Sequence, residues 1–296
     1  MEASGSRIIT YGRAGAEFSI YNVADIHWLN RGVSKTHLYR DIERIRIDPY
    51  ALFFQGGDYA DWIFPSDKRW DPAAFDEDVK VIDLNELGAL VAKAIIKIFR
   101  PIRHKGLGFL IGNHEFKAMT QKSEMYIHDH ICRELKIPNM RFSGWTDLYF
   151  VHQKGFKGGV KVTSSTIPPK KFTARLRCFI HHGMGAANTA GGKINKLKSL
   201  VDMTESDLVL CGHVHEQFAK AFLRLEPNQS CTEIGQKVTM GLITGSYLRT
   251  YAPGFTGYGE IKGYQPTTMG ATRAKYIPSE RILTVENRAD GVGLKG

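Results

Sequence analysis

Residues 107–115 read Leu-Gly-Phe-Leu-Ile-Gly-Asn-His-Glu, an apolar run that breaks at Gly112 into three polar residues. A short apolar run bounded by a glycine is typical of a buried strand. The polar residues then follow the strand, and the carboxyl ends of strands in an open α/β sheet are where ligands bind. Asn113 and His114 are therefore expected at a functional edge of a sheet rather than in its core.

Four other segments repeat this arrangement of an apolar run followed by Asp, His or Gly. Residues 18–24 lead into Asp25-Ile26-His27, residues 50–55 into Gly56-Gly57-Asp58-Tyr59-Ala60-Asp61, residues 175–180 into His181-His182-Gly183, and residues 207–211 into Gly212-His213-Val214-His215. The five expected strand ends thus deliver Asp, His and Asn side chains to what we expect to be one edge of a sheet.

The spacing of these polar residues indicates which of them can converge. In an extended chain, residues i and i+2 share a face, so Asp25 can meet His27, and His213 can meet His215. On a helix, residues i and i+2 point about 200° apart. His128 and His130, inside a helix expected over residues 118–136, are therefore assigned to a solvated face and not to a metal site.

In this order, the segments resemble the calcineurin-like metallophosphoesterase family, whose pattern is Asp-x-His, Gly-Asp-x-x-Asp, Gly-Asn-His-Asp/Glu, a strand-end His and Gly-His-x-His. The resemblance covers roughly residues 16 to 220, and residues 180 to 216 also resemble uncharacterised phage and bacterial members. It implies an α/β fold in which two packed mixed β-sheets are flanked by helices as a four-layer sandwich, with the active site at the carboxyl ends of the strands.

The resemblance also implies a dinuclear metal centre and a role for each motif residue. Its ligands would be Asp25, His27 and His215 for one ion, Asn113, His181 and His213 for the other, and Asp58 as the bridge. His181 is chosen over His182 because it comes first after the strand, although the sequence leaves this choice open. His114 would assist the leaving group, and Asp61 would orient the His114 ring.

The donor set favours certain metals, and the resemblance implies the reaction. Nitrogen and oxygen donors without thiolate suit Mn, Fe, Zn or Ni better than Ca or Mg, and two Mn ions are expected first. Two ions about 3.5 to 4 Å apart can bind a phosphoryl oxygen and lower the pKa of a bridging water. The expected reaction is hydrolysis of a phosphodiester by a metal-bound water or hydroxide, with help from His114.

The surface charge points to a polyanionic substrate. Lys and Arg together number 40 against 30 for Asp and Glu, a net charge of +10, and such a surface attracts nucleic acid. Charge alone does not decide the substrate, but together with the aromatic residues near the motifs it makes DNA or RNA the expected partner. The candidate substrate contacts are His182, Lys193, Trp28, Trp62 and Tyr247.

One departure from the resembled family narrows the substrate further. Protein Ser/Thr phosphatases continue the Gly-Asp-x-x-Asp motif with Arg-Gly, whereas Trp62 and Ile63 follow Asp61 here, which disfavours a phosphoprotein phosphatase. Two alternatives stay open. One is a phosphomonoesterase or nucleotide phosphohydrolase, and the other is a basic nucleic-acid-binding protein with a non-catalytic metal site.

Length, composition and the distribution of apolar residues predict the organisation of the chain. With 296 residues, 43% of them hydrophobic, and no apolar run of about 18 residues, we expect one cytoplasmic domain without a membrane segment. Its motif-bearing core would cover about residues 16 to 220, followed by C-terminal strands and loops over 221–296. The four cysteines lack Cys-x-x-Cys spacing, and the oligomeric state is left open.

Periodicity places the remaining elements. Helices are expected after Ser34, over residues 84–98 and over 118–136, and a loop over residues 62–75 is expected to reach toward substrate or solvent. From Asp147 onward, short strands predict a second sheet. These strands are expected over residues 148–152, 160–165, 175–180, 207–211, 217–225, 237–244 and 281–286.

Overall fold

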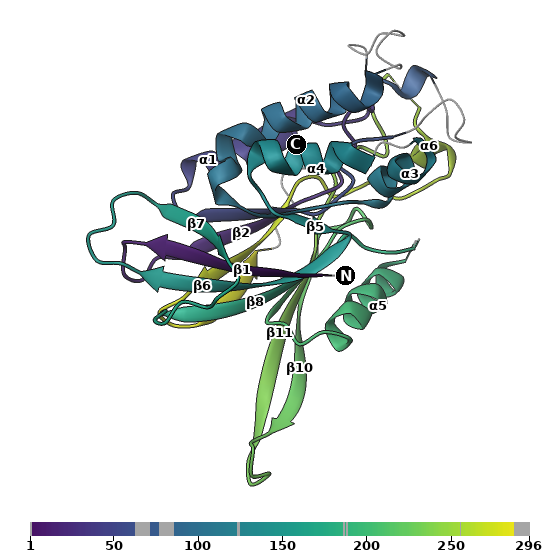
Figure 1. Ribbon diagram of the computed structural model, residues 1–296. Helices are drawn as coiled ribbons and strands as arrows, with labels where there is room; N and C mark the ends of the chain where they lie inside the picture. The colour runs from purple at the N-terminus through teal and green to yellow at the C-terminus, as the bar shows by residue number, and fades with distance from the viewer. Residues whose placement is uncertain are drawn as a thin grey trace, which may run out of the picture.

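The fold consists of two mixed β-sheets packed face to face and flanked by helices (Figure 1). The computed structural model describes residues 2–62, 72–76, 86–122, 125–185, 187, 189–254 and 256–286. The six-stranded sheet has the order β13-β12-β2-β3-β4-β5, and the seven-stranded sheet has the order β10-β11-β9-β8-β6-β1-β7.

The six-stranded sheet has a parallel core with an antiparallel edge. Its strands are β2 (Phe18–Val23), β3 (Ala51–Gln55), β4 (Gly106–Leu110), β5 (Asn139–Arg141), β12 (Thr272–Ile277) and β13 (Ile282–Glu286). Strands β2 to β5 pair in parallel, while β12 pairs antiparallel with both β2 and β13. Every residue of β2, β3 and β4 is buried, as expected for parallel strands covered on both faces.

Helices cover the outer face of this sheet (Figure 1). They are α1 (Lys35–Ile47), α2 (Leu87–Phe99), α3 (Asn113–Lys122) and α4 (Met125–Leu135), with 3-10 turns η1 (Pro72–Ala74) and η3 (Arg100–Lys105). In α1, Leu38, Ile42 and Ile45 recur every three or four residues and are buried against the sheet. The side chain of Lys105 holds the end of α1, because its Nζ donates to the carbonyls of Ile45, Arg46 and Asp48.

The seven-stranded sheet supplies the second half of the sandwich. Its strands are β1 (Glu2–Tyr11), β6 (Ser143–His152), β7 (Val160–Ser165), β8 (Ala174–His181), β9 (Leu208–Cys211), β10 (Phe218–Pro227) and β11 (Ile234–Ile243). Helix α5 (Ala190–Asp202) packs on its outer face through Leu197, Leu200 and Val201, and the short helix α6 covers Tyr258–Ile261. The space between the sheets is filled by Phe18, Leu52, Leu148 and other apolar side chains.

The predicted fold class, two packed mixed sheets flanked by helices, is confirmed. The expectation that the second sheet begins at residue 147 is wrong in two respects. Strand β1 lies between β6 and β7 in the seven-stranded sheet, and the predicted strand near residues 281–286 joins β12 in the six-stranded sheet. The pairing of β1 with β6 and that of β12 with β2 join segments far apart in the chain, which local periodicity cannot reveal, and β13 joins the six-stranded sheet only through its neighbour β12.

The expected helix over residues 118–136 is divided between α3 and α4, and the solvated-face assignment of His128 is wrong. His128 is 1% exposed, with its Nε2 atom 3.0 Å from Asn139 Oδ1, while His130 is exposed as expected. Burial lowers the pKa of His128 to about 4, so this ring is neutral at pH 7. Its role is packing between α4 and the sheet.

Most of the predicted loop over residues 62–75 lies outside the described residues. Within the part of the chain that the structure describes, no helix has the length and apolar character needed to cross a membrane. The interpretation of the chain as one domain stays a prediction.

Candidate metal centre

Side chains from five strand ends, three in one sheet and two in the other, meet at one side of the sandwich. Strands β2, β3 and β4 bring Asp25, Asp58 and Asn113, while β8 and β9 bring His182 and His213. The expectation of a single edge of a single sheet is therefore corrected, because the site lies where the edges of two packed sheets adjoin.

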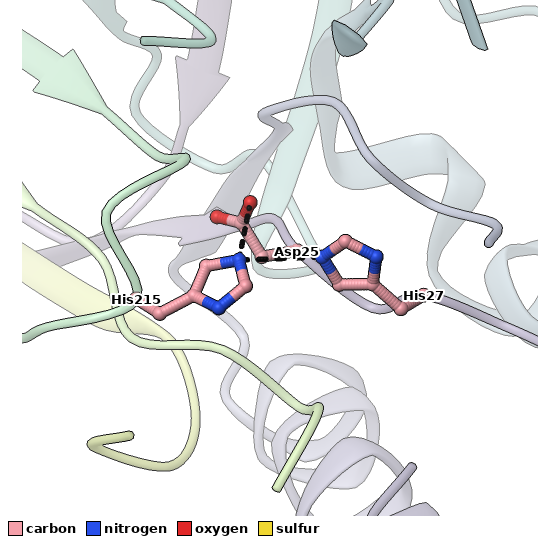
Figure 2. Close-up of side chains that lie close together, drawn as sticks. All are labelled: Asp25, His27 and His215. Atoms are coloured by element: carbon pink, nitrogen blue, oxygen red, sulfur yellow. Dashed lines mark hydrogen bonds and ion pairs between the residues drawn. The ribbon is translucent and has the colours of Figure 1, made fainter. Parts of the chain in front are cut away.

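The first group of donors is Asp25, His27 and His215 (Figure 2). His215 Nε2 lies 3.3 Å from Asp25 Oδ1 and 3.2 Å from His27 Nε2. Donor atoms bound about 2.1 Å from one ion lie about 3.0 to 3.4 Å from each other. The spacing of this group therefore fits a divalent transition metal.

The second group is Asp58, His182 and His213, with Asn113 beside it. His182 Nε2 lies 3.2 Å from Asp58 Oδ2 and 3.0 Å from Asn113 Oδ1, again the spacing of donors around one ion. The other ring nitrogen, Nδ1, is 2.9 Å from the carbonyl oxygen of Gly56, a contact that orients the imidazole. Burial by itself lowers the pKa of His182, but the adjacent Asp58 raises it to about 10.

A third group, His27, Asp58 and His114, joins the other two. It shares His27 with the first group and Asp58 with the second. Asp58 Oδ1 also accepts a hydrogen bond from the backbone N–H of His114, 2.9 Å away. The carboxylate of Asp58 thus lies between the two halves of the cluster.

Both buried carboxylates of the cluster favour the charged form. Burial by itself raises the pKa of Asp25 and of Asp58, but neighbouring imidazoles outweigh it. His215 lowers the pKa of Asp25, and His182 holds the pKa of Asp58 well below its usual range. Two buried anions surrounded by imidazoles form an environment suited to cations.

Asp61 holds the ring of His114. Asp61 Oδ1 is 2.8 Å from His114 Nδ1, and Asp61 Oδ2 accepts a hydrogen bond from Asn30 Nδ2 at 2.7 Å. Burial by itself raises the pKa of Asp61, but the adjacent imidazoles of His114 and His27 bring that pKa well below its usual range. A carboxylate on Nδ1 fixes the tautomer of the imidazole and leaves Nε2 for the site.

Backbone strain is concentrated in the same residues. A positive φ is uncommon outside glycine and costs on the order of 1 to 3 kcal/mol when it persists at a functional site. The proposed ligands with a positive φ are Asp25 (54°), His27 (53°), Asp58 (47°), His213 (70°) and His215 (53°). Five such residues in one cluster are a reason to treat it as a functional site.

Close approach explains one glycine of the motifs. A Cβ atom on Gly112 would lie 2.0 Å from Asp58 Oδ1, so a larger residue there would displace the carboxylate. The ends of β3 and β4 therefore touch through this glycine.

Glu115 is a structural residue of the site to which the sequence analysis assigned no role. One carboxylate oxygen accepts hydrogen bonds from the backbone N–H groups of Asp58 and Gly112, both at 2.8 Å. The other accepts from the backbone N–H of Ala60 at 3.0 Å and from Trp62 Nε1 at 3.2 Å. Burial and the nearby Asp58 raise the pKa of Glu115 to about 7. Its position directly after Asn113-His114 was the only signal in the sequence.

The structure does not bring His181 into any of the three groups. Its Nδ1 accepts a hydrogen bond from the backbone N–H of Gly183 at 2.8 Å, and its ring packs against Phe142. The reason is strand parity. Cys178 and Ile180 face the core between the sheets, so His182 shares their side, whereas His181 shares the side of Phe179. The alternation Arg175-Leu176-Arg177-Cys178 carried this signal in the sequence.

Two of the expected substrate contacts lie in the core instead of at the surface. Tyr247 is 0% exposed and its hydroxyl donates to Asp41 Oδ2, while Trp62 is 3% exposed and donates to Glu115. Lys193 Nζ forms an ion pair with Glu216 Oε2 at 2.5 Å. Trp28 is half-buried beside the site, and Lys35 Nζ lies 5.5 Å from the centre of its ring.

Comparison with known proteins gives distant structural likenesses only. No protein-family model and no curated protein matches the sequence. A conserved uncharacterised protein and predicted phosphoesterase from Streptococcus pneumoniae is 12% identical, with 93% of this chain and 100% of that chain covered and a TM-score of 0.34. A Vps29 double mutant from Entamoeba histolytica is 10% identical, with 91% and 97% covered and a TM-score of 0.35. Likenesses at this level support no inference about activity.

Proposed function

We propose that this protein is a metal-dependent phosphoric ester hydrolase that cleaves phosphodiester bonds, with nucleic acid as its substrate. The observation that supports it most is the pair of donor groups linked through His27 and Asp58, with donor spacings that fit transition-metal ions. The resemblance of the five strand-end motifs to metallophosphoesterases supports the same reaction.

The first ion would be held by Asp25, His27 and His215, and the second by Asn113, His182 and His213, with Asp58 in reach of both. His182 replaces the sequence-based choice of His181. When bound, two such ions neutralise phosphoryl charge and make a water molecule nucleophilic near neutral pH. Mn is the first metal to test, because the donors are imidazole, carboxylate and amide oxygen without thiolate.

The protein's own acid–base chemistry would come from His114. Asp61 anchors its Nδ1, so Nε2 can give a proton to the departing oxygen of the ester. Asp61 is in turn held by Asn30, which keeps the carboxylate and the ring in one orientation. His114 is 8% exposed, which limits competing proton exchange with bulk water.

A nucleic acid substrate is favoured by charge and by one aromatic side chain at the site. The net charge of +10 attracts polyanions. Trp28 forms two backbone hydrogen bonds with the loop that carries Asp58 and Asp61. Its N–H donates to the carbonyl of Tyr59, and its carbonyl accepts from the N–H of Asp61. Its half-buried indole is therefore the best remaining candidate for stacking on a base.

The decisive experiment is a substrate screen with Mn-reconstituted protein. Single- and double-stranded DNA and RNA, cyclic nucleotides, a diester reporter and phosphomonoesters would be compared at several salt concentrations. Cleavage of nucleic acid that falls steeply between about 50 and 200 mM salt is the expected result, because counterion release governs polyanion binding.

Two outcomes would contradict the proposal. Turnover of phosphomonoesters without cleavage of any diester would favour the phosphomonoesterase alternative. Nucleic acid binding with full metal content and no turnover of any ester would favour the non-catalytic alternative. His114→Ala serves as the control for contaminating nucleases in each assay.

A further inference from the structure

The hairpin of β10 and β11 extends beyond the body of the two sheets (Figure 1). β10 lies at the end of the seven-stranded sheet and, within the described residues, pairs only with β11. It has ten residues and an open edge. A long open edge is a template for pairing with another strand, and proteins commonly protect or use such edges.

One face of this hairpin carries an exposed apolar stripe. Leu223 lies directly opposite Val238, and Leu225 and Ile234 lie farther along the same face. Their exposed fractions are 62% for Leu223, 48% for Val238, 73% for Leu225 and 74% for Ile234. Apolar side chains that are grouped and exposed to this degree indicate a surface that another chain covers.

The hydrogen bonding of the hairpin shows which backbone groups point to the open edge. The N–H of Asn228 donates to the carbonyl of Glu233 across the turn, so Asn228 and Glu233 form a hydrogen-bonded pair. Such pairs alternate along an antiparallel ladder. Glu226, Arg224 and Phe222 therefore bond inward to β11, and the backbone groups of Leu225, Leu223 and Ala221 point outward.

We propose that β10 pairs antiparallel with β10 of a second copy of this chain, centred on Leu223. This register matches outward-pointing groups with outward-pointing groups, as a two-fold symmetric pairing requires. It places Leu223 opposite Leu223 and Ala221 opposite Leu225, so the apolar stripes of the two copies join. It also places Lys220 opposite Glu226 of the second copy, and does so twice.

Charge selects this register over its neighbours and identifies the occupant. Centring the pair on Phe222 would place Lys220 opposite Arg224, and centring it on Arg224 would place the two arginines opposite each other. Like charges directly opposite each other destabilise a pair of strands, whereas opposite charges stabilise it. Register 223 alone among the three pairs acid with base. Centring on Leu225 would also place Arg224 opposite Glu226, but it would join only residues 223–227 of β10, whereas register 223 joins residues 219–227 and is the longer self-complementary pairing.

The test is the mass of the intact protein in solution, measured by sedimentation equilibrium from about 1 to 300 µM, the range of weak to moderate homodimers. A reductant is included because Cys231 in the turn is exposed. A reversible dimer is expected. Leu223→Pro should yield a folded monomer, because proline removes only an N–H that points to the open edge.

Charge exchange distinguishes this register from any other dimer. Lys220→Glu alone and Glu226→Lys alone should each weaken the dimer about fivefold to thirtyfold, since two ion pairs become two like-charge pairs. An equimolar mixture of the two variants should dimerise again, and so should the double variant. Circular dichroism and the thermal midpoint serve as controls for folding.

Two results would overturn the proposal. One is a chain that stays monomeric up to the highest concentration, which would leave the stripe to a different partner. The other is a dimer whose mass and affinity do not respond to the single charge changes or to their combination, which would place the interface elsewhere on the molecule.

Discussion

The two sheets contribute to the candidate metal centre in different ways. The carboxylates from the six-stranded sheet are sealed, with exposures of 0% for Asp25 and 1% for Asp58. From the seven-stranded sheet, His182 is also sealed, but His213 and His215 are only half-buried. The loop that carries them is held to the six-stranded sheet by the N–H of His213, which donates to the carboxylate of Asp25. The six-stranded sheet thus supplies the buried carboxylates. The seven-stranded sheet supplies two imidazoles that solvent can reach, and a metal ion would enter from their side.

The largest expected effect comes from removing the residue common to both halves. Asp58→Asn should lower metal content at both positions and reduce activity on a diester by about 10⁴-fold or more, beyond the share of a general acid. Elemental analysis after Mn reconstitution, alongside activity, measures this. Retention of two ions per chain by the variant would contradict the bridging position of Asp58.

The next effect separates proton transfer from metal binding among the residues that the six-stranded sheet supplies. His114→Ala should keep its metal but lose about 10² to 10⁴ in rate, the usual share of general acid catalysis. Asp61→Asn should show a milder loss, because the ring keeps its place but loses the partner that orients it. Metal content and kcat are measured on the same preparations, and loss of metal from His114→Ala would instead make it a ligand.

Two adjacent histidines at the end of β8, in the seven-stranded sheet, offer a matched comparison. His182→Ala should weaken metal binding about 10- to 100-fold or more, the range found even when residues that only support ligands are changed. His181→Ala, one position earlier and on the opposite side of β8, should leave affinity near that of the unchanged protein. Calorimetric titration with Mn measures both, and the reverse result would restore the original assignment of His181.

The smallest expected effect concerns Glu115, which holds the backbone of the loops that follow β3 and β4. Glu115→Gln replaces one acceptor oxygen with an NH₂ group that faces two donors, so the free energy of unfolding should fall by about 1 to 3 kcal/mol. Urea denaturation measures it. Glu43→Gln, which alters an exposed ion pair with Arg46 on α1, is the control and should leave the midpoint nearly unchanged. Equal midpoints for both variants would contradict the role of Glu115.

The strand ends of the site could be predicted because each combines a local period with a local stop. After β4, the apolar run ends at Gly112, and Asn113 and His114 follow at the carboxyl end of the strand, as the sequence predicted. Side-chain direction was equally local, because the alternation through Leu176 and Cys178, extended to the end of the strand, directs His182 rather than His181 toward the donor groups.

Other features depend on contacts that no local pattern encodes. Glu115 accepts bonds from segments more than fifty residues away, and Trp62 and Tyr247 are aromatic residues whose exposure is set by distant neighbours. Strand β1 escaped prediction because Ser4-Gly5-Ser6-Arg7 has little apolar alternation, although Arg7 is 1% exposed and its Nε donates to the carbonyl of Leu107. Long-range pairing decides such elements.

The interleaved strand order has a consequence for synthesis. β1 must wait for β6, whose first paired residue is Gly144, and β2 acquires its antiparallel neighbour β12 only when the chain has been made beyond Thr272. During translation, β1 therefore lacks its partners until β6 and β7 have been made, and β2 keeps one edge unpaired until β12 has been made. Such edges are prone to aggregate in incomplete chains, so yield of the intact protein should depend on elongation rate and on chaperone supply.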